Sequence, residues 1–267
     1  MKVALTIAGS DSSGGAGVQA DLKTFQAHGV FGMTAITAVT VQNSCKVYSI
    51  QEISPQIVYD QIACLFNDTE IHAVKIGMVS SVELIQAIAK ALKAVKPPAI
   101  VLDPVMISKS GFRLLNQDAQ NSLVEYLFPL AEVITPNIYE AEALINRKIK
   151  TVADMKQAAK GILKLGANKV VVKGGHLSDD RATDVLYDGL EYKNLQSHWI
   201  TTKNTHGTGC TFASAIAANM ARGKEFFDAV TLAKKYITGA IEHSLSIGKG
   251  HGPTHHFFDL YAKAGIG

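Results

Sequence analysis

The sequence has few cysteines, and they lack the patterns through which cysteine usually builds a site. Its three cysteines are Cys45, Cys64 and Cys210, with no C-x-x-C spacing and no histidine at zinc-ligand spacing. His255 and His256 are adjacent but have no third ligand at a suitable spacing. We therefore expect neither a disulfide framework nor a zinc site. The scarcity of cysteine predicts a reducing, cytoplasmic location.

Charge is also scarce. Charged residues make up 18% of the chain, below the usual level of about 25%, and the formal net charge is +3 with no dense Lys/Arg block. A nucleic-acid-binding face would need clustered basic residues. No apolar run approaches the roughly 20 residues of a bilayer span, and no secretory leader pattern opens the chain. We expect neither nucleic acid nor membrane as a partner.

What the sequence has instead is a regular alternation of short apolar, β-branched segments with longer segments of helical spacing. Such alternation indicates βαβ units, an α/β fold and a mostly parallel sheet with helices on both faces. The predicted strands are 3–8, 33–41, 74–78, 99–103, 132–135 and 169–173. The predicted helices are 18–28, 55–67, 81–96, 117–127 and 151–165.

The pattern changes after Gly175. Segments 183–187 and 192–201 are expected to form antiparallel strands joined near the turn dipeptide Asp188-Gly189. Two long helices, 208–221 and 225–245, then follow. No linker, repeat or low-complexity tract interrupts the chain, so we expect residues 1–267 to form a single domain.

Polar and glycine-rich clusters follow most of the predicted strands. In open parallel sheets, ligands bind beyond the carboxyl ends of the strands, so this recurrence predicts one shared site. The clusters are Gly9 to Gly17, Gln42-Asn43, Gly77, Asp103-Pro104, Asn137 and Lys173 to His176.

A glycine-rich segment opens the helix predicted at 208–221. Gly207, Thr208 and Gly209 stand where backbone N–H groups can point outward, and a helix N-terminus adds about half a positive charge. This combination predicts a pocket for an anion and for the charge of a transferred phosphoryl group. The pattern is neither a dinucleotide fingerprint nor a P-loop, which argues against both of those enzyme classes.

Cys210 would lie inside this pocket. We expect the helix end to lower the pKa of its thiol and to make it a proton acceptor from a substrate hydroxyl. The alternative is a small residue that only packs.

Several segments carry a family resemblance in order along essentially the whole chain. They are AGSDSSGGAGVQADLKT at 8–24, DPVM at 103–106, TPNIYEA at 135–141, VKGGH at 172–176, GTGC at 207–210 and GP at 252–253. The chain resembles ribokinase-superfamily small-molecule kinases. Most members have aspartate at the position of Cys210, and a cysteine there is typical of the vitamin-kinase branch.

This resemblance implies a ribokinase-like three-layer sandwich with roughly eight or more strands, and a homodimer. It implies ATP and Mg²⁺ as cofactors. The implied reaction is phosphorylation of the hydroxymethyl group of an aminopyrimidine of thiamin biosynthesis, and then of its monophosphate.

The resemblance also implies the groups that hold Mg-ATP. Asn137 and Glu140 match an N-x-x-E motif in which the asparagine lies near the nucleotide phosphates and the glutamate helps to hold Mg²⁺ through water. Asp103 is a second candidate for the metal. Glu140 could instead serve only the dipole of its helix.

Three further side chains are expected near the nucleotide. Lys173 would neutralise the oxygens of the transferred phosphate, unless it is only a solvated strand end. His206 and Lys234 could contact the nucleotide, although Lys234 and its neighbour Lys235 could equally lie on a solvated helix face.

Substrate choice is expected to rest mainly on Gln42, whose amide could pair with an aminopyrimidine edge. Asp11 could accept a hydrogen bond from the hydroxymethyl group or, alternatively, bond its own turn. Gly9 lies in the same site, and Met78 and Val105 would form apolar walls around a flat ring.

Three alternative functions remain open at this stage. Pyridoxal or pyridoxine kinase activity, alone or as a second activity, would use the same scaffold, and Gln42 separates it because a pyridine lacks the aminopyrimidine donor edge. A non-catalytic vitamin-binding protein would have lost the metal and base positions, which this sequence keeps. A nicotinamide oxidoreductase would need the missing dinucleotide fingerprint.

Overall fold

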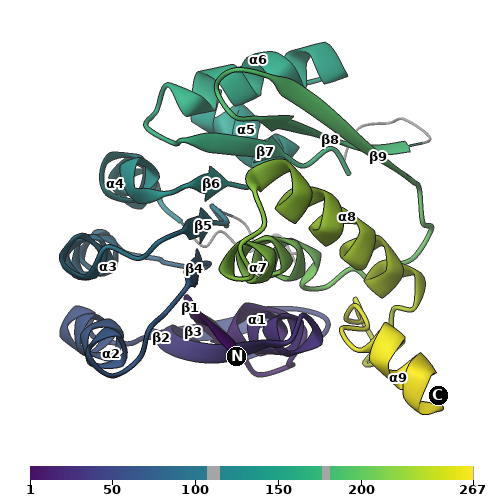
Figure 1. Cartoon of the computed structure of the whole chain (residues 1–267), viewed down its shortest axis with the longest axis horizontal. Helices are drawn as coiled ribbons and strands as arrows, with labels where there is room; N and C mark the ends of the chain where they lie inside the picture. Colours follow the sequence, from purple (N-terminus) through teal and green to yellow (C-terminus); the bar gives the residue numbers. More distant parts are fainter. Residues whose placement is uncertain (107–114, 176–180, 267) are drawn as a thin grey trace.

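The computed structural model describes residues 1–106, 115–175 and 181–266. Its centre is a nine-stranded sheet in the order β3-β2-β1-β4-β5-β6-β7-β8-β9 (Figure 1). The six central strands, β2, β1, β4, β5, β6 and β7 in sheet order, pair in parallel. The antiparallel strands are β3 at one edge of the sheet and β8 and β9 at the other. The predicted α/β class and mostly parallel sheet are confirmed.

The element bounds follow the predicted alternation. The strands are β1 Lys2–Asp11, β2 Val30–Gln42, β3 Val47–Glu52, β4 Ala73–Ile76, β5 Ile100–Leu102, β6 Val133–Ile134, β7 Lys169–Val172, β8 Arg181–Tyr187 and β9 Tyr192–His198. The helices are α1 Gly17–Ala27, α2 Pro55–Asp68, α3 Val82–Val95, α4 Gln117–Ser122, α5 Ile138–Ile145, α6 Val152–Leu163, α7 Thr208–Ala221, α8 Phe226–Glu242 and α9 Phe258–Ala264. A π-helical turn, Leu123–Leu127, and a 3-10 turn, Phe128–Leu130, follow α4.

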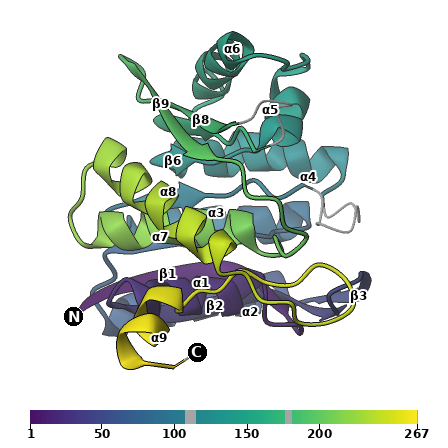
Figure 2. The ribbon, with the colours of Figure 1, turned by 90° about the vertical axis from the view of Figure 1, so that its right-hand side faces the viewer.

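Helices cover both faces of the sheet, as expected. One core lies between the sheet and α2 to α6, and a second lies between the sheet and α1, α7 and α8 (Figure 1). Figure 2 shows α7 and α8 lying over the sheet, with α9 at its lower edge. Among the described residues, no helix combines the length and apolarity needed to cross a bilayer.

Most predicted elements agree with the structure to within a few residues, and α7 agrees at both ends. Three elements were missed. The edge strand β3 has a largely exposed sequence, VYSIQE, without a clear apolar alternation, and α5 and α9 have only eight and seven residues. The predicted cap Thr151 accepts a hydrogen bond from the N–H of Asp154 on its hydroxyl oxygen. Ser81 stands at the N-cap of α3 but instead donates its hydroxyl to Glu52.

Candidate active site

The face of the sheet under α7 carries a row of buried polar side chains. Side chains alternate along a strand, and Ala73, Val101 and Val171 belong to the core under α7 and α8. The residues two positions later therefore point to the same face. These residues are Lys75, Asp103 and Lys173.

Asp103 and Lys173 form an ion pair at the carboxyl ends of β5 and β7. The Lys173 Nζ lies 2.7 Å from Asp103 Oδ1, and Thr135 donates its hydroxyl to the same oxygen at 3.1 Å. Burial alone would lower the pKa of Lys173, but the carboxylates of Asp103 and Glu140 raise it above its ordinary value. Lys173 is therefore a fixed positive charge, not a solvated strand end.

Asn137 and Glu140 form a capping box at the start of α5. The Asn137 side chain accepts the N–H of Glu140 at 2.9 Å, and Glu140 Oε2 accepts the N–H of Asn137 at 2.7 Å. Burial raises the pKa of Glu140 to about 7, although Lys173 acts in the opposite direction. Glu140 thus caps its helix and also adds a second carboxyl group beside Asp103 and Lys173.

The first turn of α7 faces this pair. A Cβ at Gly209 would lie 3.3 Å from Asp103 Oδ2 and 3.5 Å from Lys173 Nζ. The amides of Gly209 and Cys210 have no hydrogen-bond acceptor among the described residues. Free amides at a helix N-terminus, next to a lysine, are a site for an anion. The predicted anion pocket and the strand-end cluster therefore meet.

Gly207 holds this turn against the loop after β1. Its φ is +77°, and a Cβ there would lie 1.8 Å from the carbonyl oxygen of Gly15. Only glycine tolerates both the left-handed backbone and this approach. Thr208, also predicted for the site, donates its hydroxyl to the carbonyl of Thr205 and so stabilises the turn.

The expected thiol chemistry of Cys210 needs a correction. The residue stands in the first turn of α7, where a lowered pKa was expected. Burial instead raises the pKa of the thiol to about 11, and the carboxylates of Asp21 and Asp103 add to the effect. Lys75 and the N–H of Gly17 act in the opposite direction but do not overcome burial. In the free protein at neutral pH the group is a thiol.

A fully buried ion pair that the sequence analysis missed lies behind Cys210. Lys75 donates to both carboxylate oxygens of Asp21, at 3.0 and 2.9 Å. Asp21 also accepts the hydroxyls of Thr6 and Ser214, both at 2.6 Å. Lys75 interrupts an otherwise apolar strand, AVKI, and that interruption is the one signal that could have identified it.

Asp11 ends β1 and organises the loop that follows. Its carboxylate accepts the N–H groups of Ser13, Gly15 and Ala16 and the ring nitrogen Nε2 of His206, the last at 2.8 Å. Burial would raise the pKa of Asp11, but the hydrogen bonds from His206 and Ser13 outweigh it and lower the pKa to about 2. This arrangement favours the alternative role in the turn over direct contact with a substrate hydroxyl.

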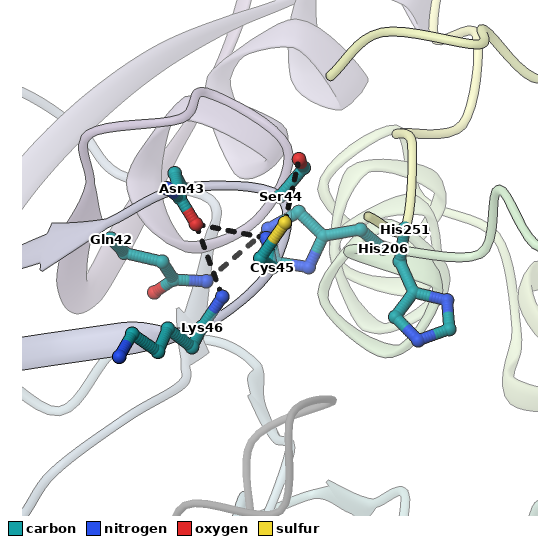
Figure 3. Close-up of a pocket in the computed structure, with 7 residues that line it drawn as sticks. All are labelled: Gln42, Asn43, Ser44, Cys45, Lys46, His206 and His251. Atoms are coloured by element: carbon teal, nitrogen blue, oxygen red, sulfur yellow. Dashed lines mark hydrogen bonds between the residues drawn. The ribbon is translucent and has the colours of Figure 1, made fainter. Parts of the chain in front are cut away.

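His206 contacts Asp11 and Gln42, and it stands three residues before Gly209, which faces the Asp103–Lys173 pair. Figure 3 shows the side chain of Gln42 pointing toward His206, with 3.4 Å between Gln42 Nε2 and His206 Nε2. Both side chains line a small, open pocket of about 10 Å³. His206 therefore lies beside the residue expected to choose the substrate, and its contact with the nucleotide stays a prediction.

The segment between α8 and α9 forms part of this pocket. The N–H groups of Gly250 and His251 donate to Ser44, at 3.0 and 2.9 Å. Figure 2 shows this segment running beside the loop before β3. Two parts of the chain that are far apart in the sequence thus border the same opening.

The expected apolar wall is partly assembled. A Cβ at Gly9 would lie 2.8 Å from the terminal methyl of Met78, so Met78 fills the space that glycine leaves. Met78 and Val105 are both partly exposed at the ends of β4 and β5. These positions agree with two walls beside the same strand ends.

Lys234 takes another partner. Its Nζ lies 2.8 Å from Asp184 on β8, and both side chains are largely buried. Asp184 also accepts the N–H of Gly174, next to Lys173. The lysine is therefore near the strand-end cluster but held in an ion pair. His176, in the resemblance segment VKGGH, lies outside the described residues.

Two groups of side chains together indicate an enzyme class: Asp103, Lys173 and Glu140 beside α7, and the pocket group of Gln42 and His206. A helix N-terminus that presents amides beside a lysine and two carboxyl groups supplies the positioning and charge that phosphoryl transfer needs. On a mostly parallel sheet covered by helices, with a second pocket at the same strand ends, it defines a small-molecule kinase of ribokinase-like fold.

The chain belongs to the phosphomethylpyrimidine kinase family, whose model matches residues 11–255. It is 49% identical to the hydroxymethylpyrimidine/phosphomethylpyrimidine kinase of Rhizobium meliloti, over 96% of this chain and 97% of the relative. The enzyme of the same name from Haemophilus influenzae is 48% identical, over 96% and 97%.

Solved structures of two kinds resemble the chain. The phosphomethylpyrimidine kinase of Clostridium difficile is 48% identical with a TM-score of 0.81, over 90% of this chain and all of the other. An ADP complex of Bacillus subtilis pyridoxal kinase is 44% identical with a TM-score of 0.90, over 96% and 98%. The pyridoxal kinase of Staphylococcus aureus with AMP-PCP and pyridoxal is 36% identical with a TM-score of 0.89, over 96% and 93%.

Proposed function

We propose that this chain transfers the γ-phosphoryl group of ATP to the hydroxymethyl group of 4-amino-5-hydroxymethyl-2-methylpyrimidine, and then to the resulting monophosphate, in thiamin biosynthesis. The family and the full-length relatives support this activity. The observation that carries it is the meeting of the α7 amides with Lys173 and Asp103, at the same strand ends as Gln42.

The transferred group is proposed to lie between α7 and Lys173. The substrate hydroxyl oxygen bonds to the γ-phosphorus while the bond from that phosphorus to the β-γ bridging oxygen breaks. The amides of Gly209 and Cys210 and the ammonium of Lys173 hold the charge that develops on the phosphoryl oxygens. Asn137, one strand away, is proposed to lie beside the remaining phosphates.

Two carboxyl groups suit a magnesium ion that accompanies the nucleotide. Mg²⁺ commonly uses one or two carboxylates together with phosphates and waters, and two such groups are Asp103, just after β5, and Glu140, in the first turn of α5. Burial raises the pKa of Glu140 to about 7, so a cation bound nearby would favour its ionised form. The ion would supply charge neutralisation at the phosphates.

Cys210 is proposed to receive the hydroxyl proton on its sulfur. The receiving form is the thiolate, which is a minor form when the pKa is about 11. Phosphoryl transfer through a loose transition state needs little removal of the proton before bond formation. Cys210 therefore contributes a limited share of the rate, and the amides and Lys173 contribute the larger share.

Phosphorylation of pyridoxal is a second candidate activity, because two of the similar solved structures are pyridoxal kinases. The same anion pocket would serve both acceptors. Gln42 is the group we propose to distinguish them, since its amide matches an aminopyrimidine edge.

A homodimer is also proposed. Val39 and Val41 on β2 and Tyr48 on β3 expose large apolar side chains on neighbouring strands at the edge of the sheet. Burial of such a patch against a second copy would remove it from water. Light scattering should give twice the chain mass, and a Val41→Lys variant should shift the mass toward the monomer.

A steady-state assay of ADP release tests the main proposal. We expect turnover with the pyrimidine alcohol and with its monophosphate, and a lower kcat/KM with pyridoxal. Phosphorus NMR of the products should give a monophosphate and then a diphosphate. Turnover of pyridoxal alone would assign the chain to the second activity, and binding of ATP without turnover of either acceptor would refute the kinase proposal.

A further inference from the structure

The protonation of His206 can be deduced from its partners. Its Nε2 lies 2.8 Å from Asp11 Oδ2, and Asp11 also accepts the N–H groups of Gly15 and Ala16 on that oxygen. An ionised carboxylate has no proton to give, so the hydrogen bond requires a proton on Nε2. Ser13, whose hydroxyl lies 3.4 Å from the same nitrogen, donates to the other oxygen of Asp11.

That proton conflicts with the orientation of the Gln42 amide seen in Figure 3. Gln42 Nε2 lies 3.4 Å from His206 Nε2, which would place two donors face to face. At its other end, Gln42 Oε1 lies 3.4 Å from the hydroxyl of Thr40, which already donates to the carbonyl of Ser10 at 3.0 Å. Two acceptors therefore meet there. Rotating the amide by half a turn lets its nitrogen donate to Thr40 and places its oxygen, rather than a second donor, beside the His206 N–H that Asp11 also accepts.

We propose that His206 is a positioning residue that sets the orientation of the Gln42 amide. In this orientation the amide oxygen is a second, weaker acceptor of the His206 N–H, whose proton is directed mainly at Asp11 2.8 Å away, and the amide nitrogen donates to Thr40. The backbone of Gln42 is held as well, because its N–H donates to Ser12 Oγ at 2.9 Å and its carbonyl accepts that hydroxyl at 2.7 Å. The amide cannot turn over without loss of both side-chain contacts.

The consequence is a substrate-reading edge of defined polarity. An amide offers two acceptor positions on oxygen and two hydrogens on nitrogen. His206 and Thr40 use one of each, which leaves one acceptor and one donor on the edge that lines the pocket. An aminopyrimidine presents the matching amino donor and ring-nitrogen acceptor. This step rests on the proposed function, whereas the orientation of the amide does not.

Kinetics of three variants test the role. His206→Phe keeps a ring but removes the N–H, so we expect KM for the aminopyrimidine alcohol to rise roughly three- to tenfold, with a much smaller change in kcat. KM for pyridoxal should change by less than about twofold. His206→Gln returns an N–H near the same place and should recover most of the affinity. Equal changes for both acceptors, or no recovery, would overturn the proposal.

Thr40→Val gives a second test that leaves both atoms of the His206–Asp11 hydrogen bond in place and removes the Thr40 hydroxyl, together with its bond to the Ser10 carbonyl. Because His206 and Thr40 fix the same rotation, either contact alone preserves much of the orientation. The double variant His206→Phe/Thr40→Val should therefore raise KM by more than the product of the single effects. If the KM of the double variant rises only by the product of the two single effects, the two residues act separately and the shared control of the amide is refuted. Thermal unfolding of each variant identifies any that fail to fold.

The tautomer gives a readout that is independent of turnover. In nitrogen-15 NMR of the wild-type protein, His206 should carry its proton on Nε2 near neutral pH. A proton on Nδ1 alone would remove the basis of the proposal. If the wild-type protein turns over neither acceptor but has the Nε2 proton, the proposed function fails and the amide orientation stands.

Discussion

Two lysine–aspartate pairs lie under α7, and they differ in how completely they are enclosed. In the Lys75–Asp21 pair both side chains are fully buried, and the carboxylate accepts four hydrogen bonds from Lys75, Thr6 and Ser214. In the Lys173–Asp103 pair the lysine is 17% exposed. Among the described residues, Asp103 Oδ2 accepts no hydrogen bond and faces Gly209.

The difference separates structural from chemical roles. The Asp21 carboxylate, with four hydrogen bonds accepted, has little remaining capacity for a ligand, and removal of one member of the pair leaves an uncompensated charge in the core. A pair with spare donor and acceptor capacity can exchange partners when an anion arrives. We infer that Lys75–Asp21 stabilises the platform on which Cys210 stands, whereas Lys173–Asp103 acts on the transferred group.

The largest effect is expected from Lys173→Met. Removal of a charge aimed at the transferred phosphoryl group should lower kcat by about 10³-fold, which corresponds to about 4 kcal/mol. The thermal midpoint should change less than in a Lys75 variant. Lys169→Met, at the other end of the same strand and paired with Glu132, is the matched control and should retain most activity. Equal losses of kcat in Lys173→Met and Lys169→Met would show that Lys173 has no special role in the transfer.

Lys75→Met should show the opposite signature. Because it leaves Asp21 buried without its cation, we expect the free energy of unfolding to fall by about 3–5 kcal/mol. Equilibrium denaturation in urea measures this change. The double variant Lys75→Met/Asp21→Asn should recover part of the loss. A stable Lys75→Met protein that lacks only activity would show that this pair, too, takes part in chemistry.

Cys210 lies between the pairs, and its effect should be intermediate. We expect Cys210→Ala to lower the rate of the first phosphorylation roughly tenfold and that of the second far less, because a phosphate acceptor is already anionic. With a thiol pKa of about 11, the first-step kcat/KM of the wild-type protein should rise as pH increases from 7 to 10. That rise should vanish in the alanine variant. Equal losses in both steps would contradict a role as base.

The last comparison concerns stability at low pH, to which the buried pair of Asp11 and His206 contributes. The pKa of Asp11 is about 2 in the folded protein, against an ordinary value of 3.8, so folding favours the ionised form. This stabilisation is present above pH 4 and is lost as pH falls toward 2, and it amounts to about 2 kcal/mol. Between pH 6 and pH 3, the free energy of unfolding should therefore fall more in the wild-type protein than in Asp11→Asn. If the free energy of unfolding falls equally with pH in both proteins, ionisation of Asp11 does not contribute to stability.

The sequence was sufficient to predict the frame and the meeting of Asp103, Lys173 and the start of α7, whereas phosphate binding there stays a proposal. Alternating apolar segments fix strand order only loosely, but parallel strands carry their polar ends to one edge regardless of that order. For this reason Asp103, Asn137 and Lys173 could be grouped from their positions along the chain alone. The glycines at 207 and 209 added a helix start with a clear chemical meaning.

The missed features depend on partners that are distant along the chain. Asp21 and Lys75 are 54 residues apart, and Asp11 and His206 are 195 apart. No local pattern reports that two such side chains meet, so the neighbours of His206 in sequence predict a nucleotide contact but not its contact with Asp11. The pKa of Cys210 was misjudged for a related reason, since burial from other segments outweighs the local helix end.

The contact between Gly15 and Gly207 has a consequence for synthesis of the protein. The two residues are 192 positions apart in the chain, yet the first loop and the start of α7 must lie against each other before the proposed phosphate pocket can form. A growing chain on the ribosome can therefore pair its early strands without any ability to hold ATP. We expect nucleotide binding to emerge in one step, only after α7 has left the exit tunnel.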